Sequence, residues 1–374
     1  MSRAMAACSS CQHQLCAAAA AGHVTCVRAL LHTRTREVDT PRALLDSVNV
    51  RNCRDGGKTP ISWAALNGHV ECVRALMDGG ADVNKGGGGG TPIFYAARRG
   101  HVECVRALMD GGADVNEGLC NITPISWAAW DGHVDCVRAL MHGGADVNKG
   151  RAGGTPIFWA SKRGDVECVR TLMEGGADVN TGDGDKTPIF WAARHGYVEC
   201  VRVLMDGGAD VNKGDGEMTP ISWAARHGQV KCVRALVDGG AHVNKGNKLK
   251  DGSQALHVAA RYGHVRCCLL LIDAGADPYA RNAEGKMPID CFSRAEHAAT
   301  WKAALQGVQV CASCGHSVCT YNVAMYDALL TTTRLMTGCC TGNHQCRQWL
   351  QPPQRTLHCA RISRWLWLWL WLWL

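Results

Sequence analysis

The sequence has little phenylalanine, and before residue 365 it has no apolar run long enough to cross a membrane. Its four phenylalanines contrast with thirteen tryptophans, five of which lie within the last ten residues. A membrane-spanning helix needs about 20 consecutive apolar residues, so we expect no membrane span along this part of the chain. The formal net charge of +7 is small for 374 residues, and both signs are interspersed. Charge therefore gives no reason to expect a nucleic-acid partner, and none is predicted.

The chain also lacks a catalytic constellation. No Ser-His-Asp set, pair of carboxylates or activated nucleophile stands apart from the repeated pattern described below. Lys58 and Thr59 suggest a phosphate-binding loop, but Asn52 occupies the place of the first glycine of that motif, and Pro60 follows. We therefore predict a protein that is not an enzyme.

The dominant feature of the sequence is a repeat of 32 residues. Thr-Pro pairs begin at residues 59, 91, 123, 155, 187 and 219. A fixed period of this length is typical of a solenoid, in which short units become stable only by stacking on their neighbours.

One unit, which begins at Thr219, shows the local signals. Thr219 can cap a first helix, and Pro220 suits the first turn of that helix. Gly228 is expected to end it in a left-handed conformation. Residues 230–237 place apolar side chains at helical spacing, so a second helix follows, and Gly239 and the glycine after it end that helix.

Residues 91–118, TPIFYAARRGHVECVRALMDGGADVNEG, resemble an ankyrin repeat almost letter for letter, and the similarity covers about residues 12–305. This resemblance implies an all-α solenoid of stacked helix-turn-helix units with short β-turn fingers. We expect an N-terminal extension over residues 1–11 and an array over 12–305, followed by a Cys/His-containing tail over 306–374. The array would hold about eight units and a truncated C-terminal cap, with an insertion near residues 34–55.

The resemblance also implies a function. It predicts a non-catalytic scaffold or adaptor that binds a partner protein through the concave surface built from the fingers and the first helices. We expect a monomer in the cytoplasm, with the nucleus as the alternative. The N-terminal residues do not form a convincing signal peptide, because polar residues interrupt their apolar stretch.

The capping position of the units departs from the family pattern. The family's usual histidine, three residues after the capping threonine, survives only as His257. Elsewhere the position holds Ser62, Phe94, Ser126, Phe158, Phe190 and Ser222. Serine can hydrogen-bond the capping threonine and phenylalanine cannot, so we expect the capping network to differ between units.

Eight of the 22 cysteines occupy one repeated slot, mostly within the pentapeptide CVRAL: Cys26, Cys72, Cys104, Cys136, Cys168, Cys200, Cys232 and Cys267. Neighbouring helices pack about 8–10 Å apart, whereas disulfide Cα atoms must lie within about 7 Å. We therefore interpret these thiols as buried packing residues. His69 lies three residues before Cys72, as in some metal sites, but the same histidine slot holds Tyr197 and Gln229. We interpret that slot as a helix start.

Two positions at the end of each first helix vary while the frame of the repeat stays fixed. The candidate partner-binding residues are Leu66, Asn67, Arg98, Arg99, Trp130, Asp131, Lys162, Arg163, Arg194, His195, Arg226, His227, Arg261 and Tyr262. Most are basic, so an acidic segment of a partner protein is the prediction. A column of Trp63, Tyr95, Trp127, Trp159, Trp191 and Trp223 runs beside them. We interpret this column as core packing, with partial exposure in a binding groove as the alternative.

The C-terminal tail leaves two further alternatives open. Cys311, Cys314, Cys340, His344, Cys346 and His358 faintly resemble a MYND-type zinc finger, although the second Cys-x-x-Cys of that motif is missing. This alternative is a zinc-binding adaptor or regulatory protein, and zinc is the one cofactor considered. Residues 365–374, WLWLWLWLWL, are too few for a membrane helix, but they could lie in a membrane interface. We favour a repetitive or misread coding segment as the origin of this run.

Overall fold

The computed structural model describes residues 15–37, 48–49, 57–87, 89–119, 122–150, 154–248 and 251–302. The chain divides into two parts, Met1–Thr320 and Tyr321–Leu374, and all described residues belong to the first. The expected extension over 1–11, most of the insertion near 34–55 and the tail over 306–374 lie outside the described residues.

Within these ranges the chain forms eight pairs of short helices, followed by a 3-10 turn and by helical residues at 295–302. The first helices of the pairs are α2 (Leu15–Ala20), α5 (Pro60–Leu66), α7 (Pro92–Arg99), α9 (Pro124–Asp131), α11 (Pro156–Arg163), α13 (Pro188–His195), α15 (Pro220–Arg226) and α17 (Ala255–Arg261). The second helices are α3 (Val24–Glu37), α6 (Val70–Asp78), α8 (Val102–Asp110), α10 (Val134–His142), α12 (Val166–Glu174), α14 (Val198–Asp206), α16 (Val230–Asp238) and α18 (Val265–Asp273). The 3-10 turn η3 spans Pro288–Cys291. The predicted all-α solenoid of helix pairs is confirmed.

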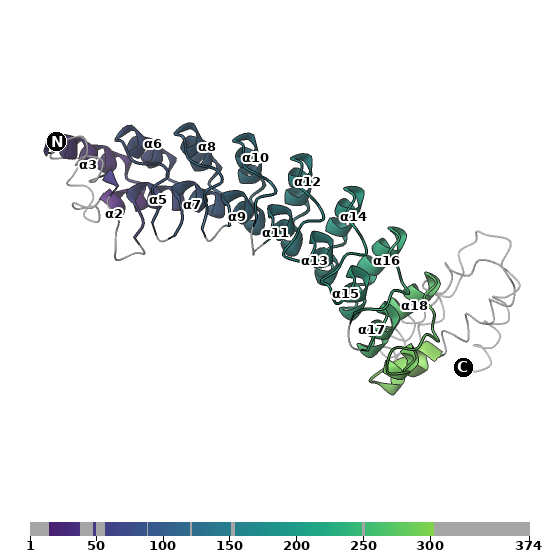
Figure 1. Ribbon diagram of the computed structural model, residues 1–374. Helices are drawn as coiled ribbons and strands as arrows, with labels where there is room; N and C mark the ends of the chain where they lie inside the picture. The colour runs from purple at the N-terminus through teal and green to yellow at the C-terminus, as the bar shows by residue number, and fades with distance from the viewer. Residues whose placement is uncertain are drawn as a thin grey trace, which may run out of the picture. The chain divides into compact units, whose positions relative to one another are not determined.

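Each pair packs against the next in register. First helices contact the first helices of neighbouring units, and second helices contact second helices, so the described units form two layers (Figure 1). Fully buried aliphatic residues such as Ile61 and Leu76 lie between the layers. Burying one such side chain stabilises the fold by about 1.5–3 kcal/mol, and each helix is too short to be stable alone. Stability therefore comes from stacking.

The capping network differs between units, as expected. Thr59 Oγ1 lies 2.9 Å from the Ser62 hydroxyl, and it also accepts from the Ser62 backbone N–H. The threonines at 123 and 219 repeat this arrangement with Ser126 and Ser222. Thr91 and Thr155, which face phenylalanine, make no such capping bond. Thr187, which also faces a phenylalanine, still accepts from the Phe190 backbone N–H. The hydroxyls of Thr91 and Thr155 donate to backbone carbonyls of the following finger, as do those of Thr59 and Thr187.

The repeated cysteines are packing residues. All eight are buried free thiols. Burial raises the pKa of Cys72 to about 11 and that of Cys136 to about 12, so these thiols remain protonated at neutral pH. The interpretation of this slot as core packing is confirmed.

Histidine side chains connect one unit to the preceding one. His101 Nε2 donates to the Leu66 carbonyl at 3.2 Å, and His133 Nε2 donates to the Arg98 carbonyl at 3.2 Å. His264 bonds the Arg226 carbonyl in the same way at 3.0 Å. The histidine slot is thus a helix start, as predicted, and in these units it also holds the backbone at the end of the preceding first helix.

Candidate partner-binding surface

The predicted pairs of variable residues come together at the C-terminal ends of successive first helices. Arg98 and Arg99 end α7, and Lys162 and Arg163 end α11. The same places hold Trp130 and Asp131 in α9, Arg194 and His195 in α13, Arg226 and His227 at the end of α15, and Arg261 and Tyr262 at the end of α17. Because consecutive first helices lie side by side (Figure 1), these positions form one series.

Most cations of this series lie over aromatic rings of the predicted column. The Arg98 guanidinium carbon is 4.5 Å from the centroid of the Trp127 ring. Arg194 lies 4.9 Å from Trp191 and 4.7 Å from Trp223. The arrangement, which we name the cation–aromatic row, comprises Lys58, Trp63, Tyr95, Arg98, Trp127, Trp130, Trp159, Lys162, Trp191, Arg194, Trp223 and Arg226. Cation–π contacts of this kind contribute about 0.5–1 kcal/mol at exposed sites.

Lys162 has the most aromatic surroundings of the row. Its ammonium nitrogen is 4.5 Å from the Trp191 ring, 4.9 Å from Trp159 and 5.3 Å from Trp130. Burial lowers the pKa of Lys162, and the nearby charges of Lys186 and Arg194 act in the same direction. A partly desolvated cation is therefore held at a fixed place among three indole rings.

The tryptophans of the column are both packed and accessible. Their side chains are half-buried, whereas Tyr95 is buried. Phe94 and Phe158 meet Trp127 and Trp191 edge-on from the preceding unit, each at 6.0 Å between ring centroids. The indole N–H groups of four members of the column are buried and have no hydrogen-bond partner in the described part of the chain: Trp63, Trp127, Trp159 and Trp191. Buried polar groups are normally paired, so these four indole N–H groups are hydrogen-bond donors that the described residues leave unused.

Three cations of the row make no ion pair within the described residues. In the ranges that the structure describes, no carboxylate lies within salt-bridge distance of Arg98, Lys162 or Arg194. On the second helices, by contrast, Arg106 pairs with Glu103 at 3.0 Å. These three cations therefore have no ion-pair partner in the described residues, although the carboxylate of Asp183 acts on Lys162 through space and raises its pKa against the effect of burial.

Two members of the predicted series differ from the rest. Arg261 forms an ion pair with Asp251 and also donates to the Ser253 hydroxyl, so its head group is engaged within the fold. Asp131 is a half-buried carboxylate next to Trp130 and is the one acidic residue of the series.

The two histidines of the series lie flat on the column. His195 stacks on Trp191 at 5.6 Å, and His227 stacks on Trp223 at 5.7 Å. Burial and the charge of Arg194 lower the pKa of each histidine. Both imidazoles are therefore neutral at pH 7, and the positive charge of the row comes from lysine and arginine.

A small apolar hollow interrupts the series of cations at Trp130. It has a volume of about 70 Å³ and is lined by Ile122, Ser126, Trp127, Trp130 and Trp159. The Trp130 and Trp159 rings meet edge-on at 4.2 Å. The Ser126 hydroxyl is used by its bond to Thr123, so the lining offers no free polar group from this side chain.

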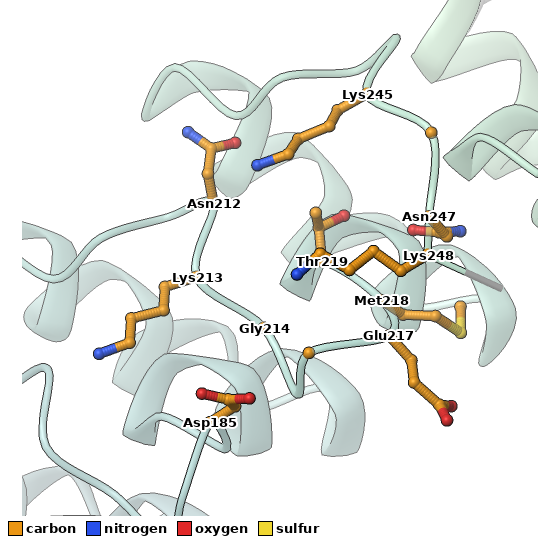
Figure 2. Close-up of a pocket in the computed structure, with 12 residues that line it drawn as sticks. Asp185, Asn212, Lys213, Gly214, Glu217, Met218, Thr219, Lys245, Asn247 and Lys248 are labelled. Carbon is orange, nitrogen blue, oxygen red and sulfur yellow. The ribbon is translucent and has the colours of Figure 1, made fainter. Parts of the chain in front are cut away.

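A second hollow, of about 210 Å³, lies between the fingers that precede α15 and α17 (Figure 2). Three lysines and two acidic residues are among those that line it: Lys213, Lys245, Lys248, Asp185 and Glu217. Asn247 is 6% exposed, and neither its side-chain oxygen nor its side-chain nitrogen is hydrogen-bonded to a described residue. A group with one donor and one acceptor, such as a peptide bond, would satisfy both atoms.

Sequence reasoning missed the residue that precedes each capping threonine. Lys58 lies over Trp63 and Tyr95 at 4.9 and 5.5 Å, and Ile122 lines the apolar hollow. Lys58 was interpreted only as part of a rejected phosphate loop. The available signal was its place immediately before a capping threonine, where the chain leaves the finger and turns into a first helix.

The alternatives that concern the tail are not decided by these observations. The candidate zinc ligands between Cys311 and His358 and the Trp-Leu run at 365–374 lie outside the described residues. Among the residues that are described, no group of three or more His, Cys, Asp or Glu side chains is arranged to hold a metal ion. No described helix has the length and apolar character that a membrane crossing requires.

Comparison with known proteins agrees with the repeat geometry. A family model described as ankyrin repeats (3 copies) matches the chain four times, at residues 8–87, 84–151, 125–215 and 213–282. The crystal structure of the human ASB11 ankyrin repeat domain is similar at 30% sequence identity and a TM-score of 0.51, over 56% of this chain and 97% of that chain. No curated protein sequence matches the chain.

Proposed function

Because the chain belongs to the ankyrin-repeat family, whose repeats are in general protein-interaction modules, we propose that it is a non-catalytic scaffold or adaptor that binds an acidic segment of a partner protein along the cation–aromatic row. The ankyrin fold is typically a non-enzymatic interaction domain. The observation that carries the proposal is the set of cations at Arg98, Lys162 and Arg194, held on aromatic faces with no ion-pair partner among the residues that the structure describes.

The arrangement suits the recognition of carboxylates for a physical reason. A guanidinium that lies over a ring keeps its N–H edge free, and that edge can bind a carboxylate in a bidentate manner. The ring also restricts the side chain before binding, so less conformational entropy is lost when a partner binds. Tryptophan and arginine dominate the binding energy of many interfaces, and both are concentrated here.

The test is a comparison of charge reversals on the two layers. The probe is fluorescently labelled poly-L-glutamate, titrated with the full-length protein at low and at physiological ionic strength. We expect the triple variant Arg98→Glu, Arg99→Glu, Arg194→Glu to weaken binding about tenfold or more, because three attractions become repulsions. Added salt should weaken the wild-type interaction, since exposed charges are screened.

The matched control reverses three exposed arginines of the second helices, which carry no aromatic partner in the described contacts. These are Arg74, Arg138 and Arg170. The control has the same net charge as the first variant, so it separates a local site from general attraction. Equal loss in both variants, or no binding of poly-L-glutamate by the wild type, contradicts the proposal.

A further inference from the structure

We infer that the hollow at Trp130 is an anchor pocket for one aliphatic side chain of the acidic partner segment, placed between two carboxylates of that segment. This inference rests on the proposed function, and it adds a sequence pattern for the partner. It follows from the place of Trp130 in the row, the size of the hollow, the charges on either side and the spacing of the units.

Trp130 is the one apolar residue within a run of cations. The equivalent position in the preceding unit is Arg98, and the following units have Lys162, Arg194 and Arg226. The ring of Trp130 packs edge-on against Trp159 and forms one wall of the hollow. A side chain that binds at this unit therefore meets indole and isoleucine surface, whereas a side chain at the unit before or after meets a cation.

The size of the hollow selects the occupant. A cavity of about 150 Å³ accepts a benzene ring, so the volume of about 70 Å³ found here suits an aliphatic side chain better than an aromatic one. A cationic occupant such as a methylated lysine is also disfavoured. The Lys162 ammonium already lies 5.3 Å from Trp130 and 4.9 Å from Trp159, and like charges so close together repel.

The spacing of the units sets the spacing of the pattern. Neighbouring helices pack about 8–10 Å apart, and an extended peptide advances about 3.3 Å per residue. One unit therefore corresponds to about three residues of a partner that lies across the first helices. The Lys162 ammonium lies 5.3 Å from Trp130, and the Arg98 guanidinium carbon lies 4.5 Å from Trp127. The carboxylates that meet these cations should therefore lie within three residues of the anchor on either side.

The experiment uses labelled peptides and the full-length protein, with fluorescence polarisation as the readout. The peptide GSESSLSSESG places glutamates three residues on either side of one leucine, and it is symmetric about the leucine, so it is independent of the direction in which the partner lies. The control peptide replaces the leucine by alanine.

We expect the alanine peptide to bind about tenfold more weakly than the leucine peptide, because the buried aliphatic surface is lost. The Trp130→Ala variant should bind the leucine and alanine peptides equally. Circular dichroism of each variant verifies that it is folded.

A second variant keeps the test decisive. Trp130→Arg places at this unit the cation that its neighbours have, so it should be compatible with the fold. It should prefer GSESSESSESG, which has a central glutamate, over the leucine peptide, and the wild type should show the opposite preference.

The outcomes separate the two levels of the proposal. If wild-type protein binds the leucine and alanine peptides equally well, the anchor pocket is wrong while the binding of acidic segments remains. If Trp130→Ala still distinguishes the two peptides, the leucine binds elsewhere and the inference is wrong. If none of the acidic peptides binds, the proposed function is contradicted together with the inference.

Discussion

Replacing Gly90 by isoleucine and Phe94 by serine, separately and together, tests how a unit accommodates phenylalanine next to its capping threonine. Phe94 is fully buried, and a Cβ atom added to Gly90 would lie 2.5 Å from its Cδ1 atom. The three atoms nearest to such a Cβ all belong to Phe94. The next unit has the opposite combination at the equivalent positions, Ile122 with Ser126. We therefore predict that the finger residue and the capping-position residue are energetically coupled.

The magnitudes follow from burial and from the close contact. Removing a buried phenylalanine side chain costs about 3–5 kcal/mol and a regained hydrogen bond to Thr91 returns about 1 kcal/mol, so Phe94→Ser should cost about 2–4 kcal/mol. Gly90→Ile alone overpacks the site, at a cost of about 1–3 kcal/mol. In the double variant the isoleucine occupies the space that Phe94 leaves. Its cost should therefore fall below the sum of the single costs by about 1 kcal/mol or more.

Native-state hydrogen exchange is the suitable assay, because repeat arrays open unit by unit. The free energy of opening would be measured for the amides of α7 and of α9, since Phe94 also contacts Trp127 of α9. Urea titrations followed by circular dichroism would verify the overall ranking. If the cost of the double variant equals the sum of the two single costs to within about 0.5 kcal/mol, the coupling is refuted.

Two further predictions concern buried ionisable groups. His257 is fully buried, and its Nε2 donates to the Ala280 and Lys286 carbonyls. Burial lowers the pKa of His257 from 6.5. The stability that the neutral imidazole supports is therefore fully present above pH 6.5, and it is lost as the pH falls through the folded-state pKa. Urea midpoints between about pH 5 and 8 should fall more steeply with acid for the wild type than for His257→Ser, and parallel curves would disprove this. Burial raises the pKa of Cys136 to about 12, so iodoacetamide at neutral pH should label Cys136 only after denaturation, as read by peptide mass mapping. Rapid labelling of Cys136 in the folded chain would contradict a buried packing role. The Cys136→Val variant should change the free energy of unfolding by less than about 1.5 kcal/mol.

The local features of this protein could be predicted from its sequence. The Thr-Pro start of each first helix, the left-handed Gly228 that follows α15 and the buried cysteine slot all depend on residues within one unit. Backbone capping and glycine conformation act over a few residues, and the 32-residue period repeats the same signals. The positions of the variable pairs followed from these signals, and the resemblance of the unit to an ankyrin repeat implied the fold class.

The contacts between side chains of different units were revealed only by the tertiary structure. The sequence showed a column of aromatic residues and a neighbouring series of cations, but it did not show that Arg98 lies over Trp127 of the next unit. Nor did it show that Lys58 belongs to the row, or that His133 holds the Arg98 carbonyl. The physical reason is that these contacts depend on the distance between stacked helices and on the rotamers that the stack permits, and spacing along one chain specifies neither quantity.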